Sequence, residues 1–270
     1  MAKVSAEAKD IYSERIRGYK QEIDQVLSRE KSILQVIQKN DEGKEYKLLT
    51  LAEERINMAS YYLLMNQISL SLLGVKNEAF INDARKSCYE SIIHLENLVS
   101  NRIDVPFSDY EEVHTKLEGF DDRQRFALVK KIGFAIHSVE DDFGDNSKWK
   151  WSFVELEGRY ATIAKNLMNL KTLVAGLDPR VDGYRERYLY LELVKKWLHS
   201  AADRYREKYE LSTNRIDDFK TGIAFLNALR RLLMIVGENE PAETVKKKAE
   251  VWKAKMDDDE KRMSAAAKKS

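Results

Sequence analysis

Residues 56–75 read INMASYYLLMNQISLSLLGV, and this stretch decides how the rest of the chain is interpreted. It is the only run of 20 residues without a charged side chain in a sequence that is 34% charged. A membrane-spanning helix needs about 20 predominantly apolar residues. Here Asn57, Asn66 and Gln67 would carry polar amides into hydrocarbon, and no basic cluster flanks one end. We therefore expect a buried helix of a helical protein and no membrane insertion.

Apolar residues in and before this stretch recur every three or four positions, which is typical of the seam between packed helices in coiled coils. Asn66 takes the place of one apolar residue in the seam. Tyr61, Tyr62 and Met65 belong to a second apolar face, so the helix is expected to contact more than one neighbour. The seam consists of Leu49, Ala52, Ile56, Ala59, Leu63, Leu70 and Leu73.

The composition indicates helices throughout the chain. Only 3 prolines and 11 glycines interrupt the 270 residues, and strong helix formers dominate the rest. Together with the periodicity, this predicts an all-α fold. We expect an elongated antiparallel helical bundle of about eight or nine long helices, beginning with a coiled-coil-like hairpin. No helical-repeat signature recurs at a fixed period.

The first helix is predicted from about Val4 to Lys39. Its apolar residues keep a spacing of three or four, interrupted only by Glu30 where an apolar residue is expected. Residues 40–43, Asn-Asp-Glu-Gly, supply turn-forming side chains. The chain should reverse there, so that the first two helices form an antiparallel hairpin.

The second and third helices are bounded by end signals. Gly74 is expected to end the second helix and Asn77 to cap the third, which runs to about residue 100. Pro106 then interrupts the helical pattern, and Ser108-Asp109-Tyr110-Glu111 matches a capping box for a short helix. This break is the best candidate for a hinge. The predicted domains are residues 1–103, 104–240 and 241–270, with one continuous domain as the alternative.

The same signals place the remaining helices along the second half of the chain. They are predicted from Asp121 or Asp122 to about 140, from Asn146 or Ser147 to Gly176, from Val181 to Leu211, from Thr213 to Gly237, and from Pro241 to about Ala266.

The sequence contains no complete catalytic or metal-binding motif. Glu111-x-x-His114 has metal-ligand spacing, but a di-iron bundle needs this motif twice, with further glutamates. No phosphate-binding loop, dinucleotide fingerprint or nucleophile elbow occurs. Cys88 lies on an apolar helix face, which favours a buried thiol over a reactive one. We expect a non-enzymatic protein without catalytic residues, cofactor or metal.

The charge distribution bears on partners and location. The 46 Lys and Arg residues nearly balance the 45 Asp and Glu residues, and the two signs interleave, so a nucleic-acid partner is not expected. A single cysteine suits a reducing compartment, and the N-terminus lacks the apolar centre of a secretory signal. These features predict a cytoplasmic protein, with a periplasmic location as the alternative if a signal peptide has been removed.

Aromatic residues are the candidates for contacts with other proteins. The chain has 13 Tyr and 4 Trp, the side chains most used as anchors at protein interfaces. Trp149 and Trp151 point in different directions at the start of a helix, so one of them is exposed or packs on the preceding loop. The predicted interaction anchors are Trp149, Trp151, Tyr184, Tyr188, Trp197 and Trp252.

Two stretches carry a resemblance to a known group of proteins. They are ISLSLLGVKNEAFINDARKSCYESIIHLENLVSNRIDVPFSDYEE (68–112) and SKWKWSFVELEGRYATIAKNLMNL (147–170). Both resemble conserved helical proteins of the spirochaete type, some of which are associated with the periplasmic flagellum. The resemblance implies a structural or assembly role and no catalytic residues. Filament proteins normally carry an export signal, which the N-terminal sequence lacks.

Two functional hypotheses follow. The first is a structural or protein-interaction protein, a scaffold or filament-associated component that binds protein partners or itself. The alternative is a helical regulatory or small-ligand-binding module, whose mark would be a closed pocket near Trp149, Tyr160 and Trp197.

Overall fold

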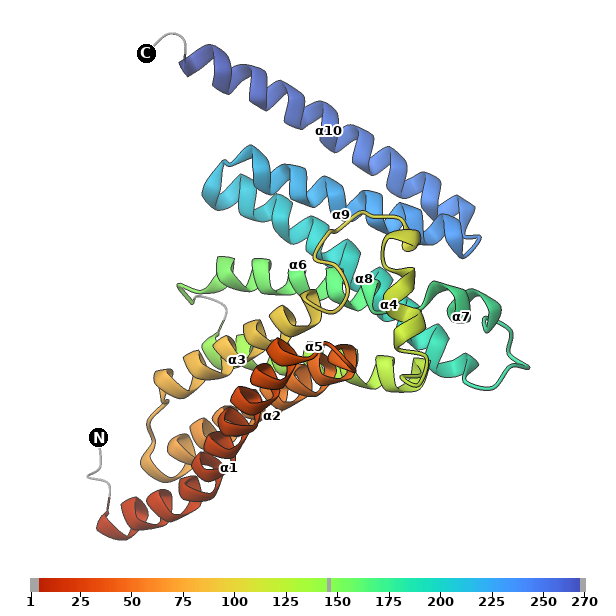
Figure 1. The fold of residues 1–270 in the computed structure, drawn as a ribbon. Coiled ribbons are helices and arrows are strands. Elements are labelled where there is room, and N and C mark those ends of the chain that lie inside the picture. Colours follow the sequence, from red (N-terminus) through yellow and green to blue (C-terminus); the bar gives the residue numbers. More distant parts are fainter. Residues whose placement is uncertain (1–4, 145–146, 268–270) are drawn as a thin grey trace. The chain divides into compact units, whose positions relative to one another are not determined.

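The computed structural model describes residues 5–144 and 147–267. Within these ranges the chain forms ten α-helices, one 3-10 turn and one π turn, without strands, which confirms the all-α class. Figure 1 shows the elements in sequence colours. They are α1 (Ala6–Lys39), α2 (Lys44–Leu73), α3 (Glu78–Glu96), η1 (Phe107–Asp109), α4 (Glu111–Lys116), α5 (Asp122–Phe143), α6 (Lys150–Asn166), α7 (Leu170–Ala175), α8 (Tyr184–Lys208), η2 (Tyr209–Thr213), α9 (Ile216–Ile235) and α10 (Asn239–Ala267).

The chain divides into two compact units, which we describe separately. The first unit contains α1, α2, α3 and most of α5, and the second contains α6 to α10 with η1 and most of α4. The division passes through α5, whose first residues belong to the second unit. By residue number, the first unit is 1–100, 116–119 and 127–150, and the second is 101–115, 120–126 and 151–270.

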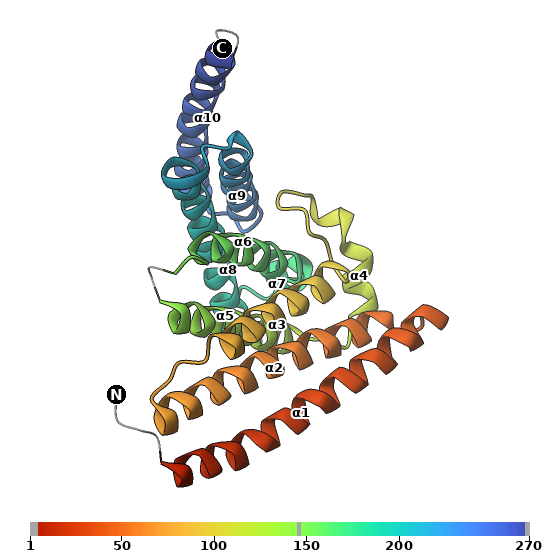
Figure 2. The same cartoon turned by 90° about the vertical axis from the view of Figure 1, so that its left-hand side faces the viewer.

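α1 and α2 form the predicted antiparallel hairpin. At the reversal the Glu42 N–H donates to Asn40 Oδ1 at 2.9 Å, and Gly43 adopts a left-handed conformation with φ of 62°, which is easy only for a residue without a Cβ. Arg29 of α1 pairs with Glu54 of α2 at 2.7 Å. Figure 2 shows the two helices lying along each other.

α2 is the central helix of the first unit, as its two apolar faces predict. The Ser91 Oγ of α3 donates to the Ala52 carbonyl at 2.8 Å, and Lys131 of α5 pairs with Glu53 at 2.9 Å. α2 therefore contacts α1, α3 and α5, and Figure 2 shows it between α1 and α3.

The burial of α2 differs in part from the expectation. Residues such as Ala52 and Ile56 are fully buried, but Leu70 is 48% exposed although it lies on the same seam. In the register fixed by the Ser91–Ala52 contact, α3 begins opposite Met65, so the last turns of α2 extend past it. Residues 56–75 are thus sheltered mainly in their first half.

Asn66, the polar residue in the seam, ties three segments together. Its Oδ1 accepts a hydrogen bond from the Asn77 N–H at 2.8 Å, and its Nδ2 donates to Asp142 of α5 at 2.9 Å. The Asn77 side chain accepts from the N–H groups of Ala79 and Phe80, which confirms Asn77 as the cap of α3. Asn66 is only 2% exposed. Its amide can be buried because both of its polar atoms are hydrogen-bonded.

α6 is enclosed by other helices of the second unit. All residues from Tyr160 to Asn166 are buried, whichever face of the helix they occupy. The Tyr190 hydroxyl of α8 donates to the Ala164 carbonyl at 2.9 Å. A Cβ at Gly158 would lie only 2.6 Å from the Tyr205 ring and 3.2 Å from Phe225, so the glycine allows α8 and α9 to approach closely.

α8, α9 and α10 pack in succession within the second unit. α10 contacts α9 through the thin stripe predicted from its sequence. Trp252 is 4% exposed, with its ring centre 6.1 Å from that of Phe219. The buried stripe is Ala242, Val245, Ala249, Trp252 and Met256.

Two features predicted from the sequence are wrong. The helix predicted from residue 147 to Gly176 is divided into α6 and α7, because the Asn169 side chain accepts from the N–H groups of Lys171 and Thr172 and caps a new helix. The capping box at Ser108 does not form, because Ser108 already lies inside η1. Of the two predicted starting residues, Asn146 lies outside the described residues, and Ser147 precedes α6 by three positions.

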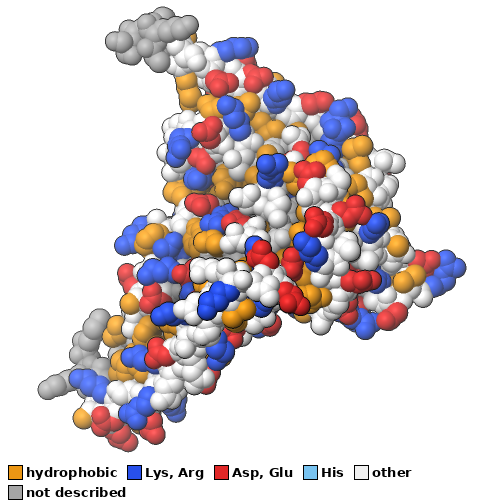
Figure 3. Space-filling model, in the orientation of Figure 1, with side chains coloured by type: hydrophobic (Ala, Val, Ile, Leu, Met, Phe, Trp, Pro, Cys, Tyr) orange, Lys and Arg blue, Asp and Glu red, His pale blue; other side chains and the backbone are white. Residues whose placement is uncertain are grey.

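The described surface is highly charged and mixed in sign. Figure 3 shows Lys and Arg interspersed with Asp and Glu over the visible face. Among residues 5–144 and 147–267 no helix combines the length and the apolar character that crossing a membrane requires.

Candidate functional site

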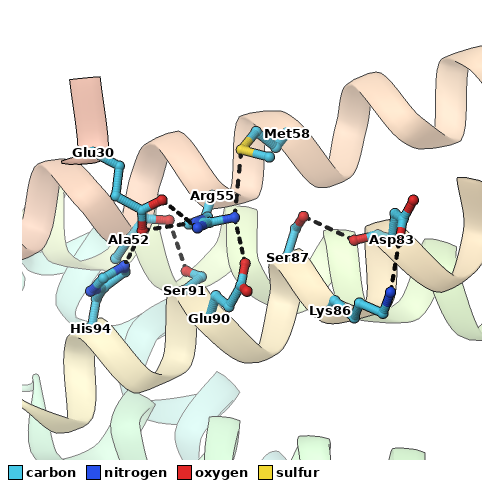
Figure 4. A network of polar contacts seen from close by, with 10 residues as sticks. All are labelled: Glu30, Ala52, Arg55, Met58, Asp83, Lys86, Ser87, Glu90, Ser91 and His94. Atoms are coloured by element: carbon cyan, nitrogen blue, oxygen red, sulfur yellow. Dashed lines mark hydrogen bonds and ion pairs between the residues drawn. The ribbon is translucent and has the colours of Figure 1, made fainter. Parts of the chain in front are cut away.

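Four ionisable side chains from three helices meet inside the first unit, and we call them the Glu30 cluster. Glu30 comes from α1, Arg55 from α2, and Glu90 and His94 from α3 (Figure 4). Arg55 Nε donates to Glu30 Oε1 at 3.0 Å, and Arg55 Nη1 lies 2.5 Å from Glu90 Oε2. His94 Nε2 lies 2.9 Å from Glu30 Oε1. The cluster explains the carboxylate that interrupts the apolar pattern of α1.

The polar groups of the Glu30 cluster are paired with one another. Glu30 is 7% exposed, and burial alone would raise its pKa, but hydrogen bonds from His94 and Arg55 outweigh burial and lower the pKa below its usual value. The carboxylate is therefore ionised and held by two donors. Such a closed set fixes α1, α2 and α3 in register, which is a structural role.

A second polar group joins α4 to the end of α6 in the second unit. His114 Nε2 lies 3.1 Å from the Asn166 carbonyl, and Arg125 Nη1 lies 2.9 Å from His114 Nδ1. Because Nε2 must donate to the carbonyl, Nδ1 accepts from Arg125 and the imidazole is neutral. Burial, with the Arg125 charge adding to it, lowers the pKa of His114 to about 4.

A cleft of about 790 Å³ opens in the second unit between the loop before η1 and the C-terminal half of α9. This volume lies within the range of about 300 to 1,000 Å³ that is usual for sites of small ligands. The cleft is lined by Asp104, Pro106, Phe107, Asn227, Arg230, Arg231, Met234 and Ile235.

A small inner cavity adjoins the cleft. It has a volume of about 10 Å³ and so has room for roughly one water molecule. Phe107, Arg231 and Ile235 border both spaces. Tyr110 and Lys165 line the inner cavity only, so they form its inner wall.

Lys165 of α6 is the unusual residue of this site. It is 5% exposed, and within the described residues its ammonium group makes no hydrogen bond or ion pair. The group lies 5.5 Å from the centre of the Tyr110 ring. Burial lowers the pKa of Lys165 to about 8, with Arg231 acting in the same direction and Asp104 against it. Burial raises the pKa of Tyr110 to about 12.

The remaining charges of the cleft are mostly positive. Arg231 Nε donates to Asp104 Oδ1 at 2.7 Å, and this pair is partly exposed. Arg230 makes no ion pair within the described residues. The cleft lining therefore has two arginines and one carboxylate, and protonated Lys165 in the adjoining cavity adds a third cation, so the site carries a surplus of positive charge.

The tryptophans near residue 150 lie in different units. Trp149 belongs to the first unit, where the Arg85 guanidinium lies 4.0 Å from its ring centre and Phe143 is 6.3 Å away. Trp151 belongs to the second unit. Both are half-buried.

The other predicted anchors lie in the second unit. Tyr184 and Tyr188 stack with ring centres 6.0 Å apart, and Tyr188 is 46% exposed. Trp197 packs edge-on against buried Tyr160, with their ring centres 5.0 Å apart. The two rings are therefore in direct contact. Trp252 is 4% exposed and packs against Phe219 of α9. The cleft described above contains none of these aromatic residues.

The structure also places the remaining candidate residues. Cys88 is fully buried, and burial raises the pKa of its thiol to about 12, as expected for a packing residue. Both imidazole nitrogens of His114 are engaged in hydrogen bonds, one with Arg125 and the other with the Asn166 carbonyl. Among the described residues no group of three or more His, Cys, Asp or Glu is arranged to hold a metal ion.

The sequence interpretation missed Lys165 and the cleft. One signal was present: Lys165 is the only charged residue from Tyr160 to Leu170. A single charge inside an otherwise uncharged stretch is a candidate for burial.

Comparison with known proteins places the chain in a family. No curated protein matches it. The model of the TP0443 family, a Treponema-type protein family, matches residues 8–260, which include both units except their extreme ends. This match fits the resemblance of residues 68–112 and 147–170 to helical proteins of the spirochaete type. The chain belongs to the TP0443 family.

Proposed function

We propose that the protein is a non-enzymatic scaffold that binds protein partners or a second copy of itself along α1. The observation that carries this proposal is an exposed apolar flank. Leu27 and Leu34 lie one heptad apart beside the buried residues of α1, yet they are 40% and 37% exposed. Heptad-spaced leucines are the contacts that helices use to pack against a further helix.

The packing of α1 supports this proposal. α1 is 34 residues long, and its buried positions form one stripe that faces the α2 side of the unit. Most of the stability of such a helix comes from its packed face. A partner helix seated on Leu27 and Leu34 would enclose the open side of the same hairpin. The buried residues of α1 are Ile16, Ile23, Val26 and Glu30.

We further propose that the partner is a component of a filament such as the flagellum. The resemblance to spirochaete-type helical proteins supports this proposal. A cytoplasmic location is part of the proposal, and a periplasmic one is the alternative. Fractionation of the native cells with an antibody against the chain determines which set of partners is available.

The test is a pair of matched double variants. Leu27→Glu with Leu34→Glu adds two charges to the exposed flank, and Gln21→Glu with Gln35→Glu adds two charges at exposed positions of α1 that point away from this flank. We expect the leucine variant to lose self-association or partner binding at least tenfold while the glutamine variant retains it. Light scattering after size-exclusion chromatography and quantitative purification from the native source are the measurements. A monomer that recovers the same proteins in all three forms would contradict the proposal.

A second candidate function is that of a helical small-ligand-binding module. The cleft beside Lys165 favours it, because the cleft has the usual size of a ligand site and a buried ammonium group adjoins it. Compounds that bind there would raise the thermal unfolding temperature of the chain.

A further inference from the structure

We propose that the cleft between residues 104–107 and α9 binds a small organic anion with an apolar body, with Arg230 and Arg231 contacting the anionic group. This inference rests on the second candidate function and names the chemical class of its ligand. Three features carry it: the surplus of positive charge, the exposed apolar wall, and the buried ammonium of Lys165.

The anionic group is assigned from the two arginines. Arg230 has no ion pair within the described residues, so its guanidinium is available to a ligand. Arg231 donates a hydrogen bond to Asp104, and its side chain borders both the cleft and the inner cavity. Two adjacent guanidinium groups suit carboxylate, sulfonate or phosphate oxygens, which they bind with charge-assisted hydrogen bonds.

The apolar body is assigned from the apolar residues of the cleft wall. Met234 is 54% exposed and Ile235 is 40% exposed, and both line the cleft with Pro106 and Phe107. Four apolar residues beside two arginines describe an amphipathic site. A simple inorganic anion would leave this apolar wall in water, whereas an organic anion would cover it.

Lys165 connects the cleft with the interior. Lys165 is 5% exposed as a residue, its ammonium group lacks a hydrogen-bond partner among the described residues, and the side chain lines the cavity behind Arg231. An unpaired buried charge is unfavourable for the fold. An anion held at Arg231 would compensate it, so ligand binding and the protonation of Lys165 should favour each other.

The experiment compares two probes with nearly the same aromatic body. Anilinonaphthalene sulfonate is an anion, and phenylnaphthylamine lacks the sulfonate. Both become fluorescent in apolar sites, and each is titrated into the full chain. We expect saturable binding of the sulfonate at least tenfold tighter than that of the neutral probe.

Three variants separate the charges. Arg230→Gln should weaken sulfonate binding about tenfold, while Arg17→Gln, an exposed arginine of α1, should leave it unchanged. Asp104→Asn removes the competing carboxylate and should tighten sulfonate binding about threefold. None of these changes should alter binding of the neutral probe, whereas a loosened fold would increase binding of both probes.

A pH titration tests the contribution of Lys165. The charged and titratable groups around it are Asp104, Tyr110 and Arg231, and Leu170 of α7 is apolar. Since the sulfonate does not titrate here, its affinity should fall about threefold as Lys165 loses its proton between pH 7 and pH 9. Lys165→Met should bind more weakly at pH 7 and show no such fall.

The outcomes distinguish the two levels of the proposal. Equal affinity for both probes, or sulfonate binding that Arg230→Gln leaves intact, would overturn the anion assignment while the ligand-binding function stands. Absence of saturable binding for either probe would overturn both.

Discussion

Each unit contains a cation that is largely sheltered from water, and the two cations are in opposite situations. Arg55 in the first unit lies between Glu30 and Glu90, and its charge is matched on both sides. Lys165 in the second unit is buried at least as deeply and has no ion-pair partner among the described residues. A matched charge inside a protein is part of the packing, whereas an unmatched one is retained at a cost in stability.

This difference separates a structural polar cluster from a candidate binding site. By composition the first unit looks more like an active site, because it brings together two glutamates, an arginine and a histidine. Its groups satisfy one another, so little remains for a ligand. The cleft has fewer ionisable groups, but its positive charge is left uncompensated. We therefore take the buried group without a partner, rather than the paired cluster, as the candidate for a binding site.

The largest expected effect comes from breaking the matched cluster. Arg55→Met leaves Glu30 and Glu90 without their shared cation, and Glu30 is then a buried carboxylate held only by His94. We expect a loss of about 4 kcal/mol in the free energy of unfolding, measured by urea denaturation.

The control is Arg29→Met in the same helix pair. Arg29 pairs with Glu54, but its side chain is 48% exposed, so the expected loss is below about 1 kcal/mol. If the two variants lost equal stability, the Glu30 cluster would not differ from a surface ion pair.

A smaller effect is expected from pH, through the buried neutral His114. An ordinary histidine in the unfolded chain has a pKa of about 6.5, whereas that of folded His114 is lowered to about 4. Between these values the unfolded state binds more protons, so stability falls as pH decreases through this window. We expect a loss of about 2 kcal/mol between pH 7 and pH 5 from this group.

His114→Gln provides the comparison, because glutamine cannot titrate. Urea denaturation of both proteins across this range should show a flatter pH dependence for the variant. Because the pKa of Glu30 is lowered in the folded state, its contribution to stability is also lost as the pH falls. Glu30 is present in both proteins, so this contribution cancels when their pH dependences are subtracted. Identical slopes would mean that folding does not lower the pKa of His114.

The smallest effect has the opposite sign. Lys165→Met removes an unpaired buried charge and keeps an apolar side chain of similar length, so the variant should be more stable at pH 7 by about 1 to 2 kcal/mol. The folded pKa of about 8 lies below the usual lysine value, so wild-type stability rises with pH above 8. The difference should therefore shrink toward pH 10. A destabilised variant would indicate that Lys165 has a partner in the folded protein.

Much of the helical framework could be predicted from the sequence, because its ends depend on local chemistry. Gly43 and Gly74 adopt the left-handed conformations expected at turns and helix ends, and the Asn77 side chain caps α3 as predicted. The break at Asn169 was missed because an uninterrupted apolar pattern continues through it. The domain boundaries and the interaction anchors remain predictions.

The candidate site could not be predicted, because it depends on distant parts of the chain. Asp104, Lys165 and Arg231 come together only when the loop before η1, α6 and α9 are packed. Neither spacing nor composition indicates that Lys165 lacks a partner. Likewise Glu30 looked like a defect in the apolar pattern until Arg55 and His94 were placed beside it.

Gly158 sets a condition on how this sequence can change. Any side chain there would collide with the Tyr205 ring, so a methyl group at position 158 would be tolerated only with a smaller residue at position 205. The two positions should vary as a pair among related chains. A redesign of α6 therefore has to choose the side chains at positions 158 and 205 together, so that their combined volume fits the space between the helices.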